Sequence, residues 1–254
     1  MRITFLGTGT SSGVPLLGCT CEVCQSTDPH DKRLRPSVLI ETDCQTRVLI
    51  DCGPDFREQM LRRPFQPFDG VLLTHFHYDH VGGLDDLRPY CVEHPVDLYL
   101  DKKTAEYVRY RMPYCFQKTP KTFVPTFNLR IVKPREAFKI KELTILPLTV
   151  MHGRSPILGF RIGRMAYLTD MKTFPASEIS LLQDLDVLIV DALQKEREHP
   201  THQNVAQALE FVEKVKPKRT YFIHMSHRAG LHAESSKMLP PRVQYAYDNL
   251  QINL

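Results

Sequence analysis

Hydrophobic and polar residues follow one another along this chain in short runs, most of which have the length of a β-strand. Runs bounded by glycine, proline or charged residues predict strands. They cover residues 2–6, 37–42, 47–51, 70–74, 137–140, 143–149, 157–162, 164–168, 187–191 and 219–223. Residues 37–51 are expected to form a hairpin, and residues 243–254 a second hairpin that turns at Asp248 and Asn249.

Two segments show a helical pattern instead. Residues 55–61 connect two predicted strands, and residues 202–215 place apolar side chains at helical spacing. No repeat of fixed period and no linker divides the chain. Two strand-rich blocks with helices outside them therefore predict a single α/β domain, residues 1–254, in which two sheets pack face to face.

The segment of about residues 102–135 differs in composition from the rest of the chain. It carries nine basic residues and a single acid, Glu106, with tyrosine and phenylalanine interleaved. Pro113, Pro120 and Pro125 prevent one long helix. One interpretation is an inserted basic, aromatic flap over the functional site that handles an anionic substrate, and the other is a solvated surface over aromatic packing.

Composition narrows the class of protein. The chain has 254 residues with 42% hydrophobic and 24% charged residues, and its net charge of +4 does not argue for nucleic acid. No run approaches a membrane-spanning helix and no signal peptide opens the chain, so we expect no membrane partner and a cytoplasmic location. The odd number of cysteines, 7, suits a metal better than a disulfide framework.

The strongest chemical signal follows the predicted strand 70–74. His75, His77, Asp79 and His80 form the pattern H-x-H-x-D-H, and Gly82 follows. A loop that leaves a rigid strand can turn such side chains toward a common point, as a metal site requires. The alternative is a polar loop whose histidines cap backbone carbonyls.

Further histidine and aspartate residues end predicted strands or follow them directly. One ion needs only three or four ligands, so this supply predicts two neighbouring ions, with Zn²⁺, Mn²⁺ and Fe²⁺ all compatible. These additional residues are Asp51, His152, Asp170, Asp191 and His224.

Two N-terminal motifs complete the chemistry. Cys19, Cys21 and Cys24 can share one tetrahedral ion that lacks a fourth ligand, or they are buried or reactive thiols. The glycine-rich residues 7–13 lack the Walker lysine and the full dinucleotide spacing. A phosphate cradle or a tight turn beside a crowded site both fit this loop.

Taken together, Asp51, the cluster from His75 to His80, His152, Asp170 and His224 resemble the five signature motifs of the metallo-β-lactamase-fold hydrolases. The resemblance implies an αββα sandwich: two mixed sheets packed face to face, with helices on both outer faces. It also implies that Asp170 bridges two ions and that Asp51 orients the ligands. By position, one ion is held by His75, His77 and His152, and the other by Asp79, His80 and His224.

Two details are similar to one branch of that family. Asp170 stands where the β-lactamases themselves use cysteine, which argues against antibiotic hydrolysis. The three cysteines together with His227 resemble the structural zinc site of the PhnP-type phosphoribosyl cyclic phosphodiesterases. That subgroup implies a histidine ahead of the late helix that contacts the phosphate, for which His202 is the candidate and His199 the reserve. Either histidine could instead cap the helix.

These features combine into one functional hypothesis. The chain is expected to be a dinuclear-metal phosphodiesterase in which metal-bound hydroxide attacks a small, cyclic phosphodiester of the phosphoribosyl cyclic phosphate type. Asp79 and Asp51 belong to the catalytic machinery, and His202 assists the leaving oxygen. The expected cofactors are two divalent ions, Zn or Mn, and one structural Zn.

Three alternatives remain. A nuclease that trims tRNA 3′ ends would use the basic segment, although the cysteine triplet and modest charge do not favour nucleic acid. A hydrolase of lactones or thioesters would use the same fold, and a metal-binding module without enzymatic activity would need only the ligands. The sequence leaves a homodimer open.

Overall fold

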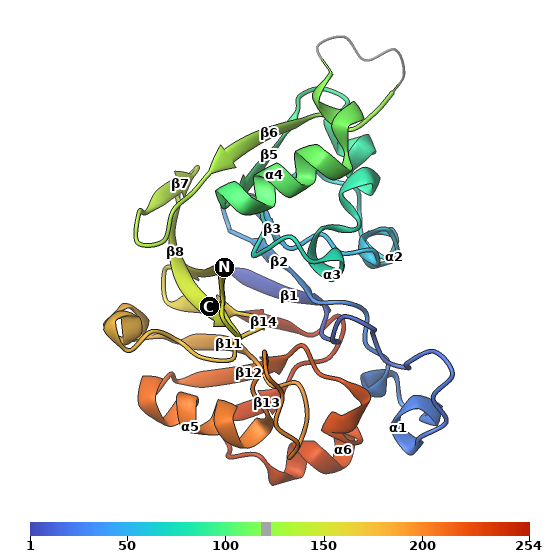
Figure 1. Ribbon diagram of the computed structural model, residues 1–254, viewed down its shortest axis with the longest axis vertical. Coiled ribbons are helices and arrows are strands. Elements are labelled where there is room, and N and C mark those ends of the chain that lie inside the picture. The colour runs from blue at the N-terminus through green and yellow to red at the C-terminus, as the bar shows by residue number, and fades with distance from the viewer. Residues whose placement is uncertain (118–122) are drawn as a thin grey trace.

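The computed structural model describes residues 1–117 and 123–254 and contains two seven-stranded mixed sheets (Figure 1). In the first sheet, β1, β2 and β3 are antiparallel neighbours, and β3 to β6 run parallel. Its spatial order is β14 (Gln251–Asn253), β1 (Arg2–Gly7), β2 (Ser37–Glu41), β3 (Arg47–Ile50), β4 (Gly70–Leu72), β5 (Val96–Leu100) and β6 (Phe127–Ile131).

The second sheet is built in the same sense along the chain as the first. It begins with antiparallel strands and continues with parallel ones from β10 to β13. Its spatial order is β13 (Val243–Tyr245), β12 (Arg219–Ile223), β11 (Val187–Asp191), β10 (Met165–Leu168), β9 (Ser155–Ile162), β8 (Leu143–His152) and β7 (Phe138–Ile140).

Helices cover the outer side of each sheet, with α2, α3 and α4 beside the first and α5 and α6 beside the second (Figure 1). The α-helices are α1 (Glu22–Gln25), α2 (Phe56–Leu61), α3 (Tyr78–Val81), α4 (Lys102–Arg111), α5 (Val205–Val215) and α6 (His232–Ser235). The 3₁₀ helices are η1 (Pro29–Asp31), η2 (Leu84–Cys91), η3 (Pro113–Phe116), η4 (Ala176–Leu182), η5 (His227–Ala229) and η6 (Ser236–Met238). The predicted αββα sandwich is therefore confirmed.

Strand alternation explains why the sheets pack as they do. Successive side chains of a strand point to opposite faces. In β1, Ile3 and Phe5 enter the core between the two sheets, whereas Leu6 enters the core under the helices. In β3, Ile50 faces the other sheet and Leu49 faces the helices. Both faces of the central strands are apolar, so each sheet must be covered on both sides.

The predicted hairpin at residues 243–254 is wrong. β13 pairs with β12 in the second sheet, and β14 pairs with β1 in the first. The connection crosses between the sheets because its backbone bonds to both: the Ala246 N–H donates to Phe222, and the Asn249 N–H donates to Phe5. Asp248 does not sit in a hairpin turn but accepts a hydrogen bond from the Leu34 N–H. The hairpin formed by β2 and β3 is confirmed.

The basic segment is part of the first layer rather than a separate flap. It forms α4, η3 and β6, and β6 pairs with β5 at the sheet edge. Most of its described cations are on the surface, for example Arg130, which pairs with Asp97. Lys103 is the described cation of this segment that lines a cavity with site histidines. Lys118, Pro120 and Lys121 lie outside the described residues.

Helix α5 begins later than the sequence predicts, at Val205, because Asn204 caps it. The Asn204 side chain accepts from the Gln207 N–H and the Gln207 side chain accepts from the Asn204 N–H, which forms a capping box. His202 therefore precedes the helix and does not cap it. No helix within the described part of the chain has both the length and the hydropathy needed to cross a membrane.

Candidate dinuclear metal site

The site lies where the carboxyl ends of strands from both sheets meet. Asp51 follows β3, His75 follows β4, His152 ends β8, Asp170 follows β10 and His224 follows β12. Three of these strand-end residues adopt positive φ angles: 61° at Asp51, 52° at Asp170 and 60° at His224. Residues other than glycine adopt such angles at an energetic cost, and the strain concentrates at functional sites.

Glycines allow the segments of the site to approach one another closely. A side chain at Gly53, directly after the β3 strand end, would lie 2.1 Å from the carbonyl oxygen of Asp79. At Gly7, in the glycine-rich loop, a side chain would lie 2.0 Å from the carbonyl oxygen of Arg35. Both contacts involve backbone, which cannot move aside. The glycine-rich loop is thus a close-packed turn, the second of the two interpretations that its sequence allowed.

One group of ligand atoms gathers around three histidines. The donor atoms of His75, His77, His152 and Asp170 all lie within 4.8 Å of one another. His75 Nε2 is 2.9 Å from His77 Nδ1 and 3.9 Å from Asp170 Oδ1. The His152 Nδ1–H faces the carbonyl oxygens of Asp170 at 2.9 Å and Thr201 at 3.2 Å, which leaves its Nε2 for the site.

A second group shares Asp170 with the first. It contains Asp79, His80, Asp170 and His224, again within 4.8 Å of one another. His80 Nε2 is 3.2 Å from both Asp79 Oδ2 and Asp170 Oδ2, and His224 Nε2 lies 3.4 Å and 3.3 Å from the same two atoms. The seven residues that the sequence proposed as ligands therefore meet in two adjoining groups joined by one carboxylate.

Asp51 orients this second group from behind. Its carboxylate accepts from the Thr74 backbone N–H at 2.8 Å and lies 2.7 Å from His80 Nδ1. All three residues are completely buried. The hydrogen bond to Asp51 keeps the proton of His80 on Nδ1 and turns its Nε2 into the site. Thr74, which the sequence did not single out, holds Asp51 with its hydroxyl as well.

The electrostatics of the site favour positive charge among its carboxylates. Burial by itself lowers the pKa of His80, but Asp79, Asp170 and Asp51 outweigh it and raise that pKa well above the usual value. Burial raises the pKa of Asp170, yet His224 and His80 outweigh it and hold that pKa well below its usual range. His75 has no such excess of carboxylates nearby, and burial lowers its pKa strongly.

The residues present fit bound metal ions. His80 Nε2 is a buried nitrogen without a hydrogen-bond partner among the described residues, although it faces two carboxylates. A buried polar atom left in this way is costly unless something binds it. Imidazole nitrogens mixed with carboxylate oxygens are the donor set of Zn²⁺, Mn²⁺ and Fe²⁺ sites.

His202 lies beside the ligands and is held by Asp191. Its Nδ1 is 2.8 Å from Asp191 Oδ2, its Nε2 is 4.0 Å from Asp170 Oδ1, and its ring stacks on that of His224 at 4.8 Å. His199, the reserve candidate, lies further out and contacts Thr201. The sequence counted Asp191 among the strand-end candidates for metal ligands but assigned it neither to an ion nor to His202, although it ends β11 just as Asp51 and Asp170 follow their strands.

The cysteine site is separate. His227 Nδ1 lies 3.2 Å from Cys19 Sγ, 3.3 Å from Cys21 Sγ and 3.5 Å from Cys24 Sγ. A hydrogen bond from the Cys24 backbone lowers the pKa of Cys21 to about 6, with burial opposing and His227 assisting. Three sulfur atoms around one nitrogen are the donor set of a structural zinc. The triplet and the distant histidine that the sequence grouped do come together.

Comparison with known proteins identifies relatives that are similar to this chain in sequence. A family profile described as "Beta-lactamase superfamily domain" matches residues 46–225. The Porphyromonas gingivalis protein named octanoyltransferase is 47% identical over 251 residues, which is 99% of this chain but 51% of that protein. The chain thus spans about half of the length of that curated relative.

Two solved structures are similar over the whole fold. The crystal structure of a diphosphatase from the PhnP family superposes with a TM-score of 0.91 and 40% identity, covering 100% of this chain and 97% of that one. Human tRNase Z, short form, superposes with a TM-score of 0.74 and 19% identity, covering 100% of this chain and 99% of that one. The second similarity establishes the fold alone.

Proposed function

This chain belongs to the beta-lactamase superfamily, as a metal-dependent hydrolase of the metallo-β-lactamase fold, and we propose that it is a phosphodiesterase. Its substrate is a small, cyclic phosphodiester of the phosphoribosyl cyclic phosphate type. The observation that carries the proposal is the pair of ligand groups that share Asp170, with the His202–Asp191 pair directly beside them. The PhnP-family relative, a diphosphatase, supports phosphate chemistry.

In this proposal, each ligand group holds one divalent ion, Zn or Mn. His75, His77 and His152 would hold the first, Asp79, His80 and His224 would hold the second, and Asp170 belongs to both groups. When bound, such a pair lowers the pKa of water and neutralises charge on the phosphate oxygens. Asp51 fixes the tautomer of His80 and so keeps one ligand aimed at the site.

Hydrolysis of a cyclic phosphodiester consumes one water molecule. The oxygen of the water joins phosphorus, one P–O bond of the ring breaks, and the leaving oxygen takes up a proton. His202 is placed to give that proton from Nε2, because Asp191 accepts from its Nδ1–H and so holds the ring with Nε2 toward the site. The proton released by the attacking water restores the imidazolium. His199 is more exposed and has no carboxylate partner in the described residues.

The cysteine site completes the proposal with one structural zinc. Cys19, Cys21, Cys24 and His227 form a closed set of four donors, which leaves no open position for catalysis. Because Cys19 and His227 are 208 residues apart, a bound ion joins the N-terminal loop to the segment that follows β12. Its role is to stabilise the fold.

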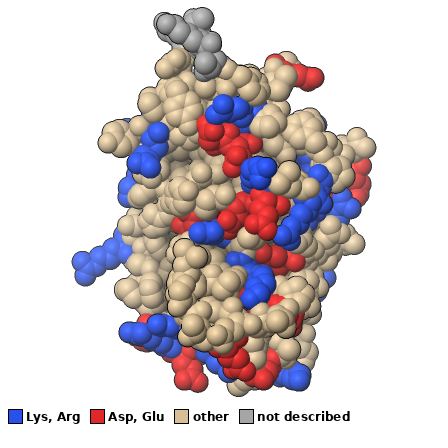
Figure 2. All heavy atoms as spheres, turned by 90° about the vertical axis from the view of Figure 1, so that its right-hand side faces the viewer, with Lys and Arg blue, Asp and Glu red and all other residues tan. Residues whose placement is uncertain are grey.

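The nuclease hypothesis receives less support. On the face that Figure 2 presents, basic and acidic side chains are mixed and do not form a continuous basic surface. An RNA substrate with many phosphates needs several unpaired cations. Several cations of the basic segment are instead paired with acids, such as Lys102 with Glu106 and Lys133 with Glu136.

Turnover assays with metal-loaded protein test the proposal. We expect cleavage of bis-p-nitrophenyl phosphate and of 2′,3′-cyclic nucleotides, and no cleavage of a tRNA precursor. Asp79→Ala and His77→Ala should lose this activity together with bound metal, whereas Asp43→Ala, which removes an exposed carboxylate, should change neither. Undiminished turnover in Asp79→Ala contradicts the two-metal mechanism.

A hydrolase of acyl thioesters is the second candidate function. It is favoured by the name octanoyltransferase, which belongs to a relative about half of which lies outside the matched region. Octanoyl thioester is the substrate to include in the same assays. Faster hydrolysis of this thioester than of every phosphodiester would move the assignment from phosphate to acyl groups.

A further inference from the structure

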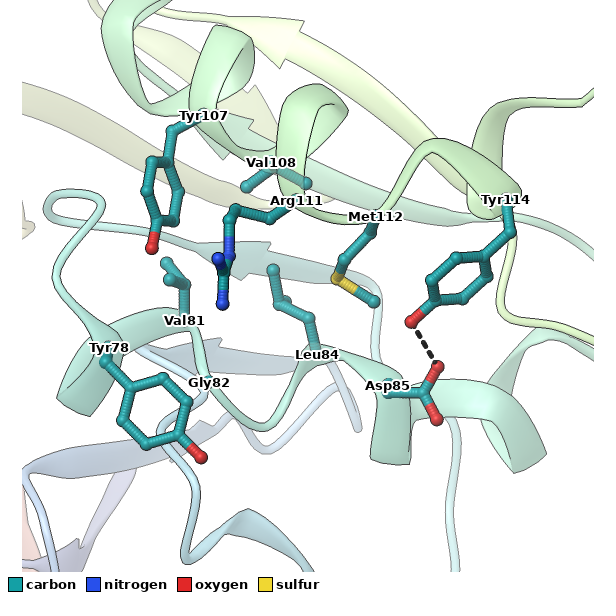
Figure 3. Close-up of a pocket in the computed structure, with 10 residues that line it drawn as sticks. All are labelled: Tyr78, Val81, Gly82, Leu84, Asp85, Tyr107, Val108, Arg111, Met112 and Tyr114. Carbon is teal, nitrogen blue, oxygen red and sulfur yellow. Dashed lines mark hydrogen bonds between the residues drawn. The ribbon is translucent and has the colours of Figure 1, made fainter.

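A cavity of about 150 Å³ lies beside the candidate metal site, between α4 and the segment that carries α3 (Figure 3). Tyr78, Val81 and Leu84 line one side, and Tyr107, Val108 and Arg111 line the other. Complete sites for drug-sized ligands measure about 300–1,000 Å³. This cavity is therefore large enough for one ring system and too small for a polymer.

None of the metal ligands lines the cavity, but residues next to them in the sequence and in ring contacts connect the two. Tyr78 stands between His77 and Asp79, one from each ligand group. The Tyr107 ring packs on Phe76 with centroids 5.2 Å apart, and Phe76 packs on the His77 imidazole at 5.1 Å. One phenylalanine ring, Phe76, thus separates the cavity wall at Tyr107 from the ligand His77.

The walls suit a flat aromatic group. Two tyrosine rings, Tyr78 and Tyr107, flank an apolar floor (Figure 3). Gly82 leaves the space that the Tyr78 ring occupies, because a side chain there would lie 2.7 Å from Tyr78 Cε2. Tyr78 is 62% exposed, so its ring is available for contact with a ligand. Stacking on aromatic rings is the common way in which proteins hold bases without reading their sequence.

The two charged side chains of the cavity, Asp85 and Arg111, differ in their hydrogen bonding. Asp85 is already satisfied, since it accepts from the Tyr114 hydroxyl at 2.8 Å and from Arg88 at 2.7 Å. The guanidinium of Arg111 reaches into the cavity (Figure 3), and in the part of the chain that the structure describes it has neither a hydrogen bond nor an ion pair. Its fork of N–H donors is free for acceptor atoms on the edge of a ring.

We propose that this cavity binds the heteroaromatic base of the substrate, so that the substrate is a nucleoside cyclic phosphate. This inference rests on the proposed phosphodiesterase function, and it places a nucleoside where that proposal has a phosphoribosyl group. The base stacks on Tyr107 and Tyr78, and Arg111 donates to its ring acceptors. Lys103, whose Nζ lies 4.7 Å from the Phe76 ring centre, lines the neighbouring small cavity with His75 and His77 and faces the phosphate end.

A matched pair of substrates tests the proposal. Adenosine 2′,3′-cyclic phosphate and methyl riboside 2,3-cyclic phosphate differ only in the base. We expect the protein to prefer the adenosine compound in kcat/KM by about 10-fold or more, the effect of one stacked base. Tyr107→Ala should remove this preference and leave turnover of the methyl riboside unchanged. Tyr110→Ala, an 81% exposed tyrosine of the same helix, should keep the preference.

A second variant keeps the test valid if Tyr107→Ala does not fold. Arg111→Met removes an exposed guanidinium and should also lower the preference, whereas Arg109→Met, whose guanidinium packs on Phe116, should not. Equal kcat/KM for the two substrates, or equal losses on both in Tyr107→Ala and Arg111→Met, overturns the base-binding proposal while the phosphodiesterase function stands. Failure of the wild-type protein to cleave either compound overturns the proposed function itself.

Discussion

His224 and His227 are three residues apart, yet they belong to two candidate metal sites of different construction. His224 follows β12 directly, is 1% exposed and joins nitrogen and oxygen donors carried by both sheets. His227 lies in η5 and meets three thiols of the N-terminal loop, of which Cys21 is exposed. The first site is built on rigid strand ends, and the second ties loops together.

In our proposal, this difference separates the residues that carry the chemistry from those that stabilise the fold. The first site mixes imidazole with carboxylate and retains a neighbouring acid–base pair, His202 with Asp191. The second has four soft or borderline donors, which complete the tetrahedral shell of one ion. We expect loss of the first site to abolish activity with little unfolding, and loss of the second to do the reverse. The predictions below test this contrast.

The largest effect is expected from Asp170→Asn. Asp170 belongs to both ligand groups, so the change should release both active-site ions. Loss of activity should exceed the roughly 10–100-fold that alterations of indirect partners cost. Turnover of bis-p-nitrophenyl phosphate and metal analysis measure it, with Asp184→Asn, at an exposed carboxylate, as control. One zinc per chain should remain. If Asp170→Asn loses that zinc too, the sites are not independent.

His202→Ala should leave both metal sites filled and still lose about 10²–10⁴-fold in rate, the usual contribution of a general acid or base. Asp191→Asn should lose less, because the imidazole remains but is no longer held by the carboxylate. His199→Ala is the matched control. Loss of bound metal in His202→Ala would make this residue a ligand, and normal kinetics would leave the role to His199 or to no residue.

Cys21→Ser should have the opposite effect, with a larger loss of stability than of activity. We expect loss of the tightly held zinc, a lower melting temperature and only a secondary fall in activity, because His227 is connected to the ligand His224 by two residues. Thermal unfolding and metal analysis after mild chelation measure these effects, and Cys44→Ser, another exposed cysteine, is the control. A variant that keeps its zinc and melts like the parent would show that the thiols have no structural metal.

The smallest effect concerns acid stability at His232, in α6. Burial, followed by Arg33 and His30, lowers the pKa of His232 from 6.5 to about 4. A depressed pKa in the folded state contributes stability that is present above pH 6.5 and is lost as the pH falls toward 4. His232→Gln should therefore flatten the decline in melting temperature between pH 7 and pH 5. His94→Gln, at an exposed histidine, should not, and equal slopes in all three proteins would contradict the assignment.

The sequence by itself determined the local features of the site. The cluster from His75 to His80 lies within six residues and needs only one strand and one turn to be formed. Asp51, His152 and Asp170 were found because apolar runs mark strands, and a polar residue that directly follows such a run lies at the end of a strand. The αββα architecture followed from the resemblance that these motifs carry, and the fold confirms it.

Only the tertiary structure decided which distant segments pair. Residues 243–254 read locally as a hairpin, yet β13 pairs with β12 and β14 pairs with β1, two strands that are far apart in the chain and belong to different sheets. β5 was not identified, and β6 was hidden in a basic segment, since an edge strand can expose polar side chains.

For the same reason, some site residues could be recognised from the sequence and others only from contacts between elements. The ligands from His75 to His80 are neighbours in the sequence, so their pattern can be recognised before the structure is known. The hydrogen bond from His202 to Asp191 and the cavity between α3 and α4 join residues from different segments and exist only after the chain has folded. The spacing of residues in the sequence indicates only which side chains lie on the same face of one strand or helix. Contacts between elements depend on sheet order, register and packing, which are set by the whole core at once.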